Sequence, residues 1–524
     1  MFRHHHSSHA SVLHTATPGN RSVVALLAFG IAMGLSPAPQ ARQESPAPQV
    51  RQESPAPQAR QEKTVPVGWQ GPAQLVDAPD LNPDPRIVEV TLDARVATVE
   101  TAPGHRFDAW TYNGSLPGPL IRVRVGDRLI VRFTNHLPQP TTVHWHGLRI
   151  PIQMDGVPGA SQPEVKPGES FVYDFTVPDA VLYWYHPHVM SAAQVGFGLY
   201  GALLVEDPTE DARGFDEIIM VLSDIEVSPQ GKLEDPESGG STGMAFGREG
   251  NWLLVNGREM PQMRARAGVP QRWRVVNAAK SRYFQLDPDG PRFTTIGGDA
   301  GLQAGPVESD TLVIAPGERI DAIFTPVAKS GNTLTVDWRL FNRGYGSVEA
   351  RVPIGPLFEI AIEGTPPAKP VAYPVLSRAI EPLSTAGARE VMVELTIAQR
   401  SNGAFEYGIN GVPFQKGRPF SARLGETQIW KLVNTTAWSH PFHIHGFFFQ
   451  VLDQNGNPVR PLAWKDTVDV PFKSELRIAV KFDDDRPGEW MFHCHVLDHA
   501  DGGLMGTVVV GNGPAAAAIS THTH

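Results

Sequence analysis

Short runs of alternating or β-branched residues, separated by Gly/Pro turns, recur along the chain from about residue 66. Runs such as LIRVRVGDRLIVRFTN (120–135), RWRVVNAA (272–279) and QIWKLVNT (428–435) alternate apolar and polar residues, as strands with one buried face do. The chain contains 50 Gly and 48 Pro, and both residue types weaken helix interiors. The sequence therefore predicts an all-β protein built from Greek-key β-sandwiches.

The length of the chain and the recurrence of similar strand segments indicate several such sandwiches. At 524 residues the chain is too long for one hydrophobic core, and about 150 residues per domain suggests three domains. The segments GALLVEDP (201–208), GPLFEIAIEG (355–364) and GTVVVGN (506–512) resemble the closing strands of three successive units. We therefore expect three domains, at residues 66–208, 209–364 and 390–512, and a Pro-rich linker at residues 365–389.

The segment before residue 66 predicts export. Residues 23–35 form a run of 13 apolar or small residues, which suits a signal-peptide core and is short for a bilayer span. We expect a signal peptide over residues 1–35, a mature chain without a transmembrane segment, and a periplasmic or extracellular location; an uncleaved anchor is the alternative. Three tandem SPAPQxRQE units in residues 36–65 predict a disordered linker, and residues 513–524 a flexible tail.

Charge and cysteine content exclude two classes of protein. The formal net charge is −10, which excludes a broadly basic nucleic-acid binder. Cys494 is the only cysteine, so no intramolecular disulfide can form. A lone thiol in a chain of this size is either an inert buried group or a reactive or ligating one.

The histidines are strongly clustered. No histidine lies between residues 189 and 439, and only two histidines of the central part of the chain, His105 and His136, stand alone. Residues i and i+2 of a strand share one face, so an HxH pair presents two imidazoles together. Ten histidines fall into four clusters: His144 and His146; His186 and His188; His440, His443 and His445; His493, His495 and His499.

The last cluster also contains the cysteine, which narrows the choice of metal. Imidazole suits zinc, copper, iron and nickel, and one thiolate with two histidines is the blue-copper set. The spacing from Cys494 to His499 allows both side chains to bind one ion, with a third ligand from elsewhere. Zinc is the rival, but structural zinc sites usually use closed sets of four ligands, and the sequence has no CxxC pair.

Four motifs resemble the copper motifs of the multicopper oxidases, in order and in internal spacing. They are HWHG (144–147), WYHPH (184–188), HPFHIHG (440–446) and HCHVLDHADGGLM (493–505). YNGSLPGPLIRVRVGD (112–127) and APGERID (315–321) resemble other segments of the same family. The resemblance is to the bacterial three-domain, laccase-like type. It implies three consecutive cupredoxin-like domains, copper in the first and third, and reduction of O2 to water.

The resemblance also implies four copper ions per chain and assigns their ligands. The type 1 ion would take His440, Cys494 and His499; the type 2 ion His144 and His443; the two type 3 ions His146, His186 and His495, and His188, His445 and His493. Electrons would enter through an exposed edge of His499 and pass through Cys494. Asp155 lies at the family's spacing for an acid beside the cluster, and O2 reduction consumes protons.

Two positions depart from the family pattern. Leu504 stands where the family has a weak axial ligand, often Met, and Met505 follows it. Either Leu504 faces the type 1 copper, which raises its potential, or a shift of one residue lets Met505 bind. Ala500 stands where many bacterial relatives have Glu, between Asp498 and Asp501. This leaves open which residue is the second proton-relay acid.

We therefore predict a laccase-like enzyme that oxidises phenols or aromatic amines and reduces O2. The alternative is a metal-ion oxidase for Cu(I), Fe(II) or Mn(II). A copper-storage or structural protein is disfavoured because the ligand set is complete, and a copper nitrite reductase because all eight histidines of a trinuclear set are present. The expected partners are a small-molecule reductant and O2, with no nucleic acid, and the expected state is a monomer.

Overall fold

The computed structural model describes residues 73–210, 214–288, 290–327, 331–344, 352–372, 375–483 and 485–512. The predicted signal peptide, the repeat linker and the tail lie outside these residues. None of the helices in these residues could span a bilayer.

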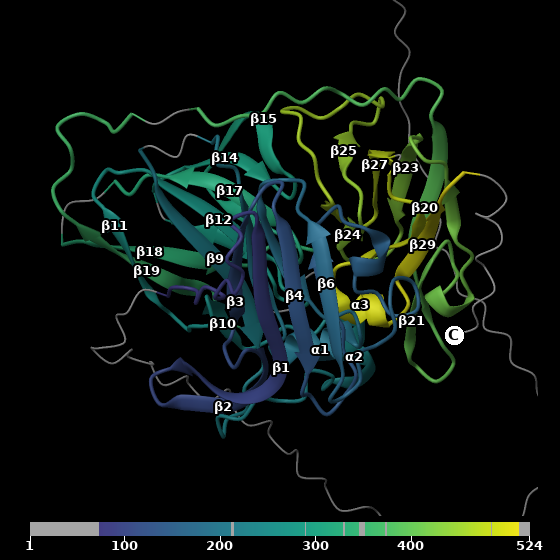
Figure 1. Cartoon of the computed structure of the whole chain (residues 1–524), viewed down its shortest axis with the longest axis horizontal. Coiled ribbons are helices and arrows are strands. Elements are labelled where there is room, and N and C mark those ends of the chain that lie inside the picture. The colour runs from purple at the N-terminus through teal and green to yellow at the C-terminus, as the bar shows by residue number, and fades with distance from the viewer. Residues whose placement is uncertain are drawn as a thin grey trace, which may run out of the picture. The chain divides into compact units, whose positions relative to one another are not determined.

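Three successive β-sandwiches make up the described chain, and each contains one sheet built around the same trio of strands (Figure 1). In each trio the first strand pairs in parallel with the second, which pairs antiparallel with the third. The trios are β1 (Ile87–Ala102), β4 (Arg128–Asn135) and β6 (Ser170–Thr176); β9 (Asp216–Ile225), β12 (Gln271–Asn277) and β17 (Arg319–Phe324); and β20 (Arg389–Gln399), β23 (Thr427–Asn434) and β27 (Ser474–Lys481).

The middle strands of the outer two trios show why the sequence folds this way. In β4 the apolar side chains of Leu129, Val131 and Phe133 are buried, and the residues between them are exposed or half-buried. In β23 Trp430 and Leu432 follow the same alternation. A period of two places every second side chain on the core side, so these runs bury one face of the sheet.

Other strands complete the first sheet of each sandwich. They are β2 (His105–Tyr112); β10 (Trp252–Val255), β14 (Phe293–Gly298) and β15 (Gly301–Ser309); β21 (Phe405–Ile409) and β25 (Phe449–Leu452).

The second sheet of each sandwich contains most of the strands that hold the histidine motifs. These sheets consist of β3 (Gly118–Arg124), β5 (His144–His146), β7 (Leu182–His186) and β8 (Gly201–Glu206); β11 (Gln262–Arg266), β13 (Phe284–Asp287), β16 (Leu312–Ile314), β18 (Thr333–Arg339) and β19 (Gly355–Glu363); β22 (Phe420–Ala422), β24 (His440–Ile444), β26 (Thr467–Val470), β28 (Gly488–Cys494) and β29 (Met505–Val510). The three segments that the sequence predicted as closing strands form β8, β19 and β29. The predicted domain boundaries stay predictions.

Each sandwich has its own hydrophobic core, formed by residues from both of its sheets. A further buried cluster joins the sandwiches. In it Leu182 and Trp184 of β7 pack with Val276 of β12 and with Leu497, which follows β28. The three sandwiches therefore bury apolar surface against one another, which fixes the histidine-bearing strands relative to each other.

The described residues include three short helices, which lie close together below β24 in the view of Figure 1. They are α1 (Ser191–Gly196), α2 (Gly240–Phe246) and α3 (Leu497–Asp501), and short 3-10 turns cover Ile152–Met154 and Phe414–Lys416. Helix α3 directly follows Cys494 and its neighbour His495, and it contacts both α1 and α2. The segment that contains His499 is thus packed between elements of the first two sandwiches.

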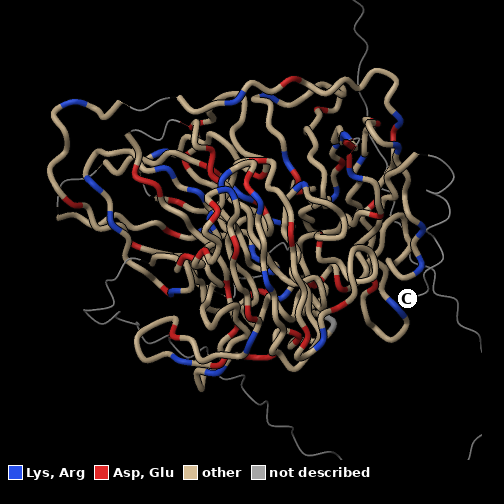
Figure 2. Tube along the Cα trace, in the orientation of Figure 1, with Lys and Arg blue, Asp and Glu red and all other residues tan. Residues whose placement is uncertain are grey.

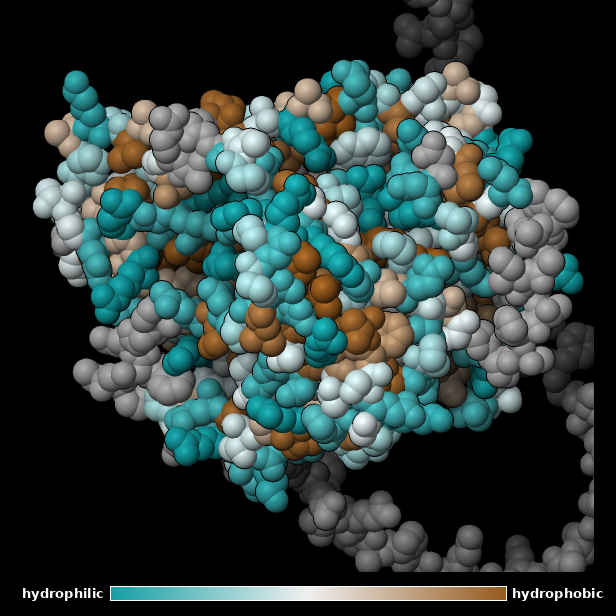
Figure 3. Space-filling view, viewed as in Figure 1, coloured by the Kyte–Doolittle hydropathy of each residue, from teal (hydrophilic) through white to brown (hydrophobic). Residues whose placement is uncertain are grey.

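Charged residues of both signs are interspersed along the strands (Figure 2). Several form cross-strand pairs, such as Arg128 with Asp174 and Arg132 with Glu89. In the space-filling view, hydrophobic residues appear as separate patches among hydrophilic ones (Figure 3). Exposed ion pairs of this kind contribute little to stability, so the buried cores are the main source of the folding energy.

Candidate metal centres

The only cysteine lies in a buried cluster with two histidines of the third sandwich. The Cys494 Sγ atom is 3.4 Å from His440 Nδ1 and 3.7 Å from His499 Nδ1, and the two Nδ1 atoms are 3.1 Å apart. All three residues are at most 1% exposed. We call these three residues the Cys494 cluster. One soft thiolate and two imidazoles at this spacing fit a copper ion.

Hydrogen bonds on the far side of each ring fix its tautomer. His499 Nε2 lies 3.3 Å from the Ala245 carbonyl, which can only accept, so Nε2 carries the proton and the Nδ1 lone pair faces the cluster. His440 Nε2 lies 2.8 Å from the Thr436 hydroxyl, which gives that ring the same orientation. The turn at Thr436 is held by the buried Asn434 amide, which donates to the carbonyl of Trp438.

The expectation of an exposed His499 edge is wrong. His499 is fully buried, because helix α2 of the second sandwich covers it and supplies the Ala245 carbonyl. The Tyr407 ring stacks on the His499 ring at 4.4 Å between centroids, and its hydroxyl also donates to Ala245, at 2.7 Å. The sequence did not reveal this cover, because α2 lies more than 250 residues before His499.

Eight further histidines meet between the first and third sandwiches. Strand pairing brings them together within each sandwich: His144 lies opposite His186, and His443 opposite His493. Across the two sandwiches, the His144 ring stacks on His445 at 3.9 Å between centroids. The eight residues, which we call the eight-histidine group, are His144, His146, His186, His188, His443, His445, His493 and His495.

Ring nitrogens of this group approach one another as ligands of shared ions would. Within each of three sets, one nitrogen per residue lies within 4.8 Å of the others. The sets are His144, His146 and His443; His146, His186 and His495; and His188, His445 and His493.

The hydrogen bonding of these rings fits a metal. The Nδ1 atoms of His144, His443 and His493 lie 2.7, 3.0 and 2.9 Å from main-chain carbonyls, so they carry the protons and leave Nε2 as the lone-pair atom. Several buried nitrogens have no hydrogen-bond partner among the described residues: Nε2 of His144, His186, His188 and His443, and both ring nitrogens of His495. Buried polar atoms are normally paired, so this convergence is what bound metal ions would satisfy.

Burial also keeps the ligand atoms in the state that a metal needs. It lowers the pKa of His440 to about 3 and the pKa of His499 well below its ordinary value. It lowers the pKa of His186, His188 and His493 strongly as well. Burial raises the pKa of the Cys494 thiol, so a thiolate there requires a neighbouring cation, which a bound metal provides.

Asp155 contacts two residues of the eight-histidine group, His144 and His445. Its Oδ2 atom is 2.8 Å from Nδ1 of His445, and its main-chain carbonyl accepts the Nδ1 proton of His144. The residue is 1% exposed. Asp155 thus orients one histidine from each of the two sandwiches that bear the group, and it is the acid that the sequence placed beside the cluster.

The side chains of the two other acids near His499, Asp498 and Asp501, both accept hydrogen bonds. Asp498 is bound by Arg248 and Ser281 of the second sandwich; the Arg248 main-chain N–H lies 2.7 Å from Oδ2. Asp501 accepts a hydrogen bond of 2.8 Å from the Ala192 main-chain N–H, at the start of α1 and four residues after His188. Asp501 is therefore bonded to the first sandwich and Asp498 to the second.

The register of the last two strands places Leu504, rather than Met505, on the side of the sheet that Cys494 faces. His493 lies opposite Met505, and the Cys494 N–H donates to the Leu504 carbonyl at 3.1 Å. Residues that lie opposite each other share a face of a sheet, so Leu504 is on the side of Cys494. Leu504 is fully buried in the same apolar cluster as Cys494, and Met505 is half-exposed.

The second sandwich contributes to the eight-histidine group although it contains no histidine. A Cβ atom at Gly317 would lie 2.8 Å from His495 Cδ2 and 3.1 Å from His146 Cε1. Arg319 contacts Asp466, whose main-chain carbonyl accepts from His443. The family-like APGERID motif includes both Gly317 and Arg319, but spacing alone gave no sign of this contact.

Three β-sandwiches with a Cys–His–His cluster next to an eight-histidine group define the class of copper-dependent oxidases. Family profiles described as multicopper oxidase match residues 93–210, 216–337 and 387–514. The chain belongs to the multicopper oxidase family, and its sandwiches are cupredoxin-type domains. The family resemblance and the all-β fold predicted from the sequence are confirmed. The family binds copper and uses O2 as electron acceptor.

Multicopper oxidases and a laccase of other organisms are similar to the chain. The multicopper oxidase MmcO of Mycobacterium tuberculosis is 33% identical over 459 residues, covering 80% of this chain and 86% of that protein. A laccase of Bacillus subtilis is 26% identical over 465 residues, covering 76% of this chain and 89% of that protein. A solved multicopper oxidase of Campylobacter jejuni, described as a metallo-oxidase, has a TM-score of 0.73 at 27% identity, over 84% of this chain and 94% of that one.

We predict that Gly317→Ala reduces copper binding by the eight-histidine group. The new Cβ atom would displace His495 or His146, and the φ of +85° adds backbone strain. Copper content and the type 2 electron paramagnetic resonance (EPR) signal measure the effect. Gly425→Ala is the control, because it has a φ of +74° but no atom within 4 Å of its Cβ position. Equal copper content in the two variants would contradict the prediction.

Proposed function

We propose that this multicopper oxidase is laccase-like and takes electrons one at a time from phenols or aromatic amines. We also propose that the Cys494 cluster holds type 1 copper and the eight-histidine group a type 2 ion and a type 3 pair, with the ligands that the family resemblance implies. Bound copper would supply the one-electron acceptor and the centre at which O2 is reduced. A cavity beside the Cys494 cluster is the observation that carries the choice of substrate.

The cavity has a volume of about 380 Å³, which suits a small aromatic molecule. Its wall includes four aromatic side chains, those of Phe246, Tyr283, Trp338 and Phe341. The lining residues, all within the described part of the chain, include no Met or His that would hold a soft metal ion. An aromatic wall without such ligands favours a flat organic donor.

Two residues connect this cavity to the Cys494 cluster. Phe246 forms part of the wall, and the preceding residue, Ala245, accepts the hydrogen bond from His499. Arg343 also lines the cavity, and its carbonyl accepts from the N–H of Ser439, the residue before His440. A donor in the cavity is thus separated from His499 by helix α2 rather than being in contact with it.

Cys494 is placed to pass electrons on to the eight-histidine group. Its two chain neighbours, His493 and His495, belong to the two proposed type 3 ligand sets. A few covalent bonds therefore connect the thiolate to both sets. Asp155, which holds His445 and His144, is the proposed acid for the protons that O2 reduction consumes.

Oxidation of Cu(I), Fe(II) or Mn(II) is the second candidate, because Met244 of α2 packs against the apolar cluster that includes Cys494. A thioether is a soft ligand that suits Cu(I). However, two of the five carboxylates that line the cavity are already paired with arginines: Asp224 with Arg282 at 2.8 Å, and Glu249 with Arg343 at 2.7 Å. This arrangement supports the aromatic donor over the metal ion.

We predict faster turnover with a phenol than with Cu(I) or Fe(II), measured as O2 consumption under the same conditions. Phe341→Ala should raise the KM for the phenol, because the Phe341 ring stacks on Tyr283 at 5.3 Å and forms part of the cavity wall. An aromatic contact is worth about 0.5–1.5 kcal/mol, so KM should rise about 2–10-fold. Faster turnover with Cu(I) or Fe(II), and an unchanged phenol KM in Phe341→Ala, would favour the second candidate.

We predict that Leu504→Met lowers the type 1 potential. A methionine at this buried position would add a weak axial sulfur donor, which stabilises Cu(II). A fall of about 60 mV would correspond to ~1.4 kcal/mol for a one-electron couple. Redox titration of the blue absorption measures it, and Met505→Leu is the control because Met505 lies on the other face of the sheet. A shift in Met505→Leu alone would show that Met505 is the axial residue.

A further inference from the structure

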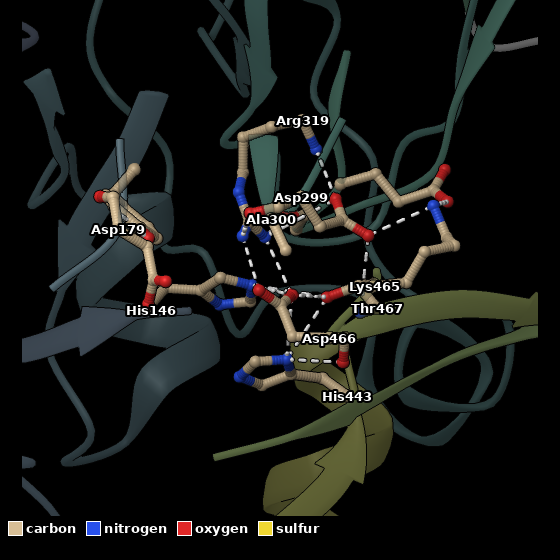
Figure 4. A network of polar contacts seen from close by, with 12 residues as sticks. His146, Asp179, Asp299, Ala300, Arg319, His443, Lys465, Asp466 and Thr467 are labelled. Atoms are coloured by element: carbon tan, nitrogen blue, oxygen red, sulfur yellow. Dashed lines mark hydrogen bonds and ion pairs between the residues drawn. The ribbon is translucent and has the colours of Figure 1, made fainter. Parts of the chain in front are cut away.

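A buried ion pair links the second sandwich to the third beside the eight-histidine group. Arg319 is the first residue of β17, and Asp466 immediately precedes β26. The Arg319 Nη1 atom donates to Asp466 Oδ1 at 2.8 Å, and Nη2 contacts Oδ2. Both side chains are 1% exposed, and Figure 4 shows the guanidinium facing the carboxylate. A two-pronged contact of this kind fixes the plane of the carboxylate.

Asp466 in turn holds a histidine of the group. Its main-chain carbonyl lies 3.0 Å from His443 Nδ1. Its Oδ1 atom accepts from the Thr467 hydroxyl at 2.8 Å, and the same hydroxyl oxygen lies 3.1 Å from His443 Nδ1 and 3.2 Å from His146 Nε2 (Figure 4). Arg319, Asp466 and Thr467 thus form a chain of contacts that ends on two histidines from different sandwiches.

The loop after His146 packs directly on the ion pair. A Cβ atom at Gly147 would lie 2.4 Å from Arg319 Nη2 and 2.5 Å from Asp466 Oδ2. Only glycine permits this approach, and its φ of +86° suits glycine as well. The motif HWHG of the first sandwich therefore contacts a pair formed by the other two.

Arg319 is itself held rigidly within the second sandwich. Its guanidinium donates to the main-chain carbonyls of Gly317, at 3.0 Å, and Asp299, at 2.6 Å. Lys465 holds the Asp299 side chain at 3.0 Å and Glu318 at 3.1 Å. The position of Asp466 is consequently set by a frame that contains none of the proposed copper ligands.

We propose that Arg319 is a positioning residue for the trinuclear copper site: through Asp466 and Thr467 it fixes the ring orientation and tautomer of His443 and the place of His146. The domain without copper ligands thereby takes part in assembling the site. Partners that orient a metal-bound histidine typically change metal affinity 10–100-fold when they are lost. This proposal rests on the ligand assignment made above, but not on the identity of the electron donor.

The test compares Arg319→Lys and Arg319→Met with the wild type in copper-loaded protein. Arg319→Lys keeps the buried positive charge but cannot make the two-pronged contact. We expect both variants to keep the blue absorption of the Cys494 cluster and to lose type 2 copper, with about 10–100-fold weaker affinity and a changed type 2 EPR spectrum. Elemental analysis, EPR and the melting temperature are measured on the same samples.

Arg272→Lys is the matched control. Arg272 is also a buried arginine of the second sandwich, with 3% of its side chain exposed. Its Nε atom donates to Asp321 at 2.9 Å, and Asp321 lies two residues after Arg319 in the sequence. It is paired with carboxylates of the same sandwich and has no contact with a histidine in the described part of the chain. We expect Arg272→Lys to lower the melting temperature without changing the type 2 spectrum.

Two results would overturn the proposal. The first is a type 2 spectrum and copper content in Arg319→Lys equal to those of the wild type. The second is a failure of both Arg319 variants to fold while Arg272→Lys folds, which would make the pair a purely structural element. A wild type that loads copper without any type 2 signal would instead refute the ligand assignment on which the proposal rests.

Discussion

The placement of Cys494 between two histidines is the constraint on which the rest of the structure depends. Successive side chains of a strand point to opposite faces, so the end of β28 directs the thiol to one side and His493 to the other. The thiol joins His440 and His499 inside the third sandwich. The flanking histidines join a group that this sandwich shares with the first. One strand end therefore belongs to both metal centres.

This constraint explains why the sandwiches must pack as they do. The eight-histidine group takes four residues from the first sandwich and four from the third, and rings stack across the boundary, as His146 does on His443 at 3.8 Å. Burial removes water from these imidazoles and keeps them neutral, as metal ligation requires. The second sandwich adds α2 over His499 and the Arg319–Asp466 pair beside His443. It serves both centres without supplying a proposed ligand.

Strand alternation is a local pattern, and it predicted the all-β fold. The structure brings the residues of the four histidine motifs together in two clusters. The sequence could not predict contacts between distant segments. Arg319 and Asp466 are 147 residues apart, and nothing local marks them as partners. The expectation of an exposed His499 failed for the same reason, since α2 covers it from another sandwich. The choice between Leu504 and Met505 needed the register of β28 and β29.

The central claim is that one chain holds a type 1 copper at Cys494 and three further copper ions at the eight-histidine group. Copper content, measured by elemental analysis together with the blue absorption in the wild type and in Cys494→Ser, tests it most directly. The account predicts about four ions in the wild type and about three in Cys494→Ser, with the blue absorption lost. Zinc in place of copper, a single copper ion per chain, or blue absorption that persists in Cys494→Ser would contradict it.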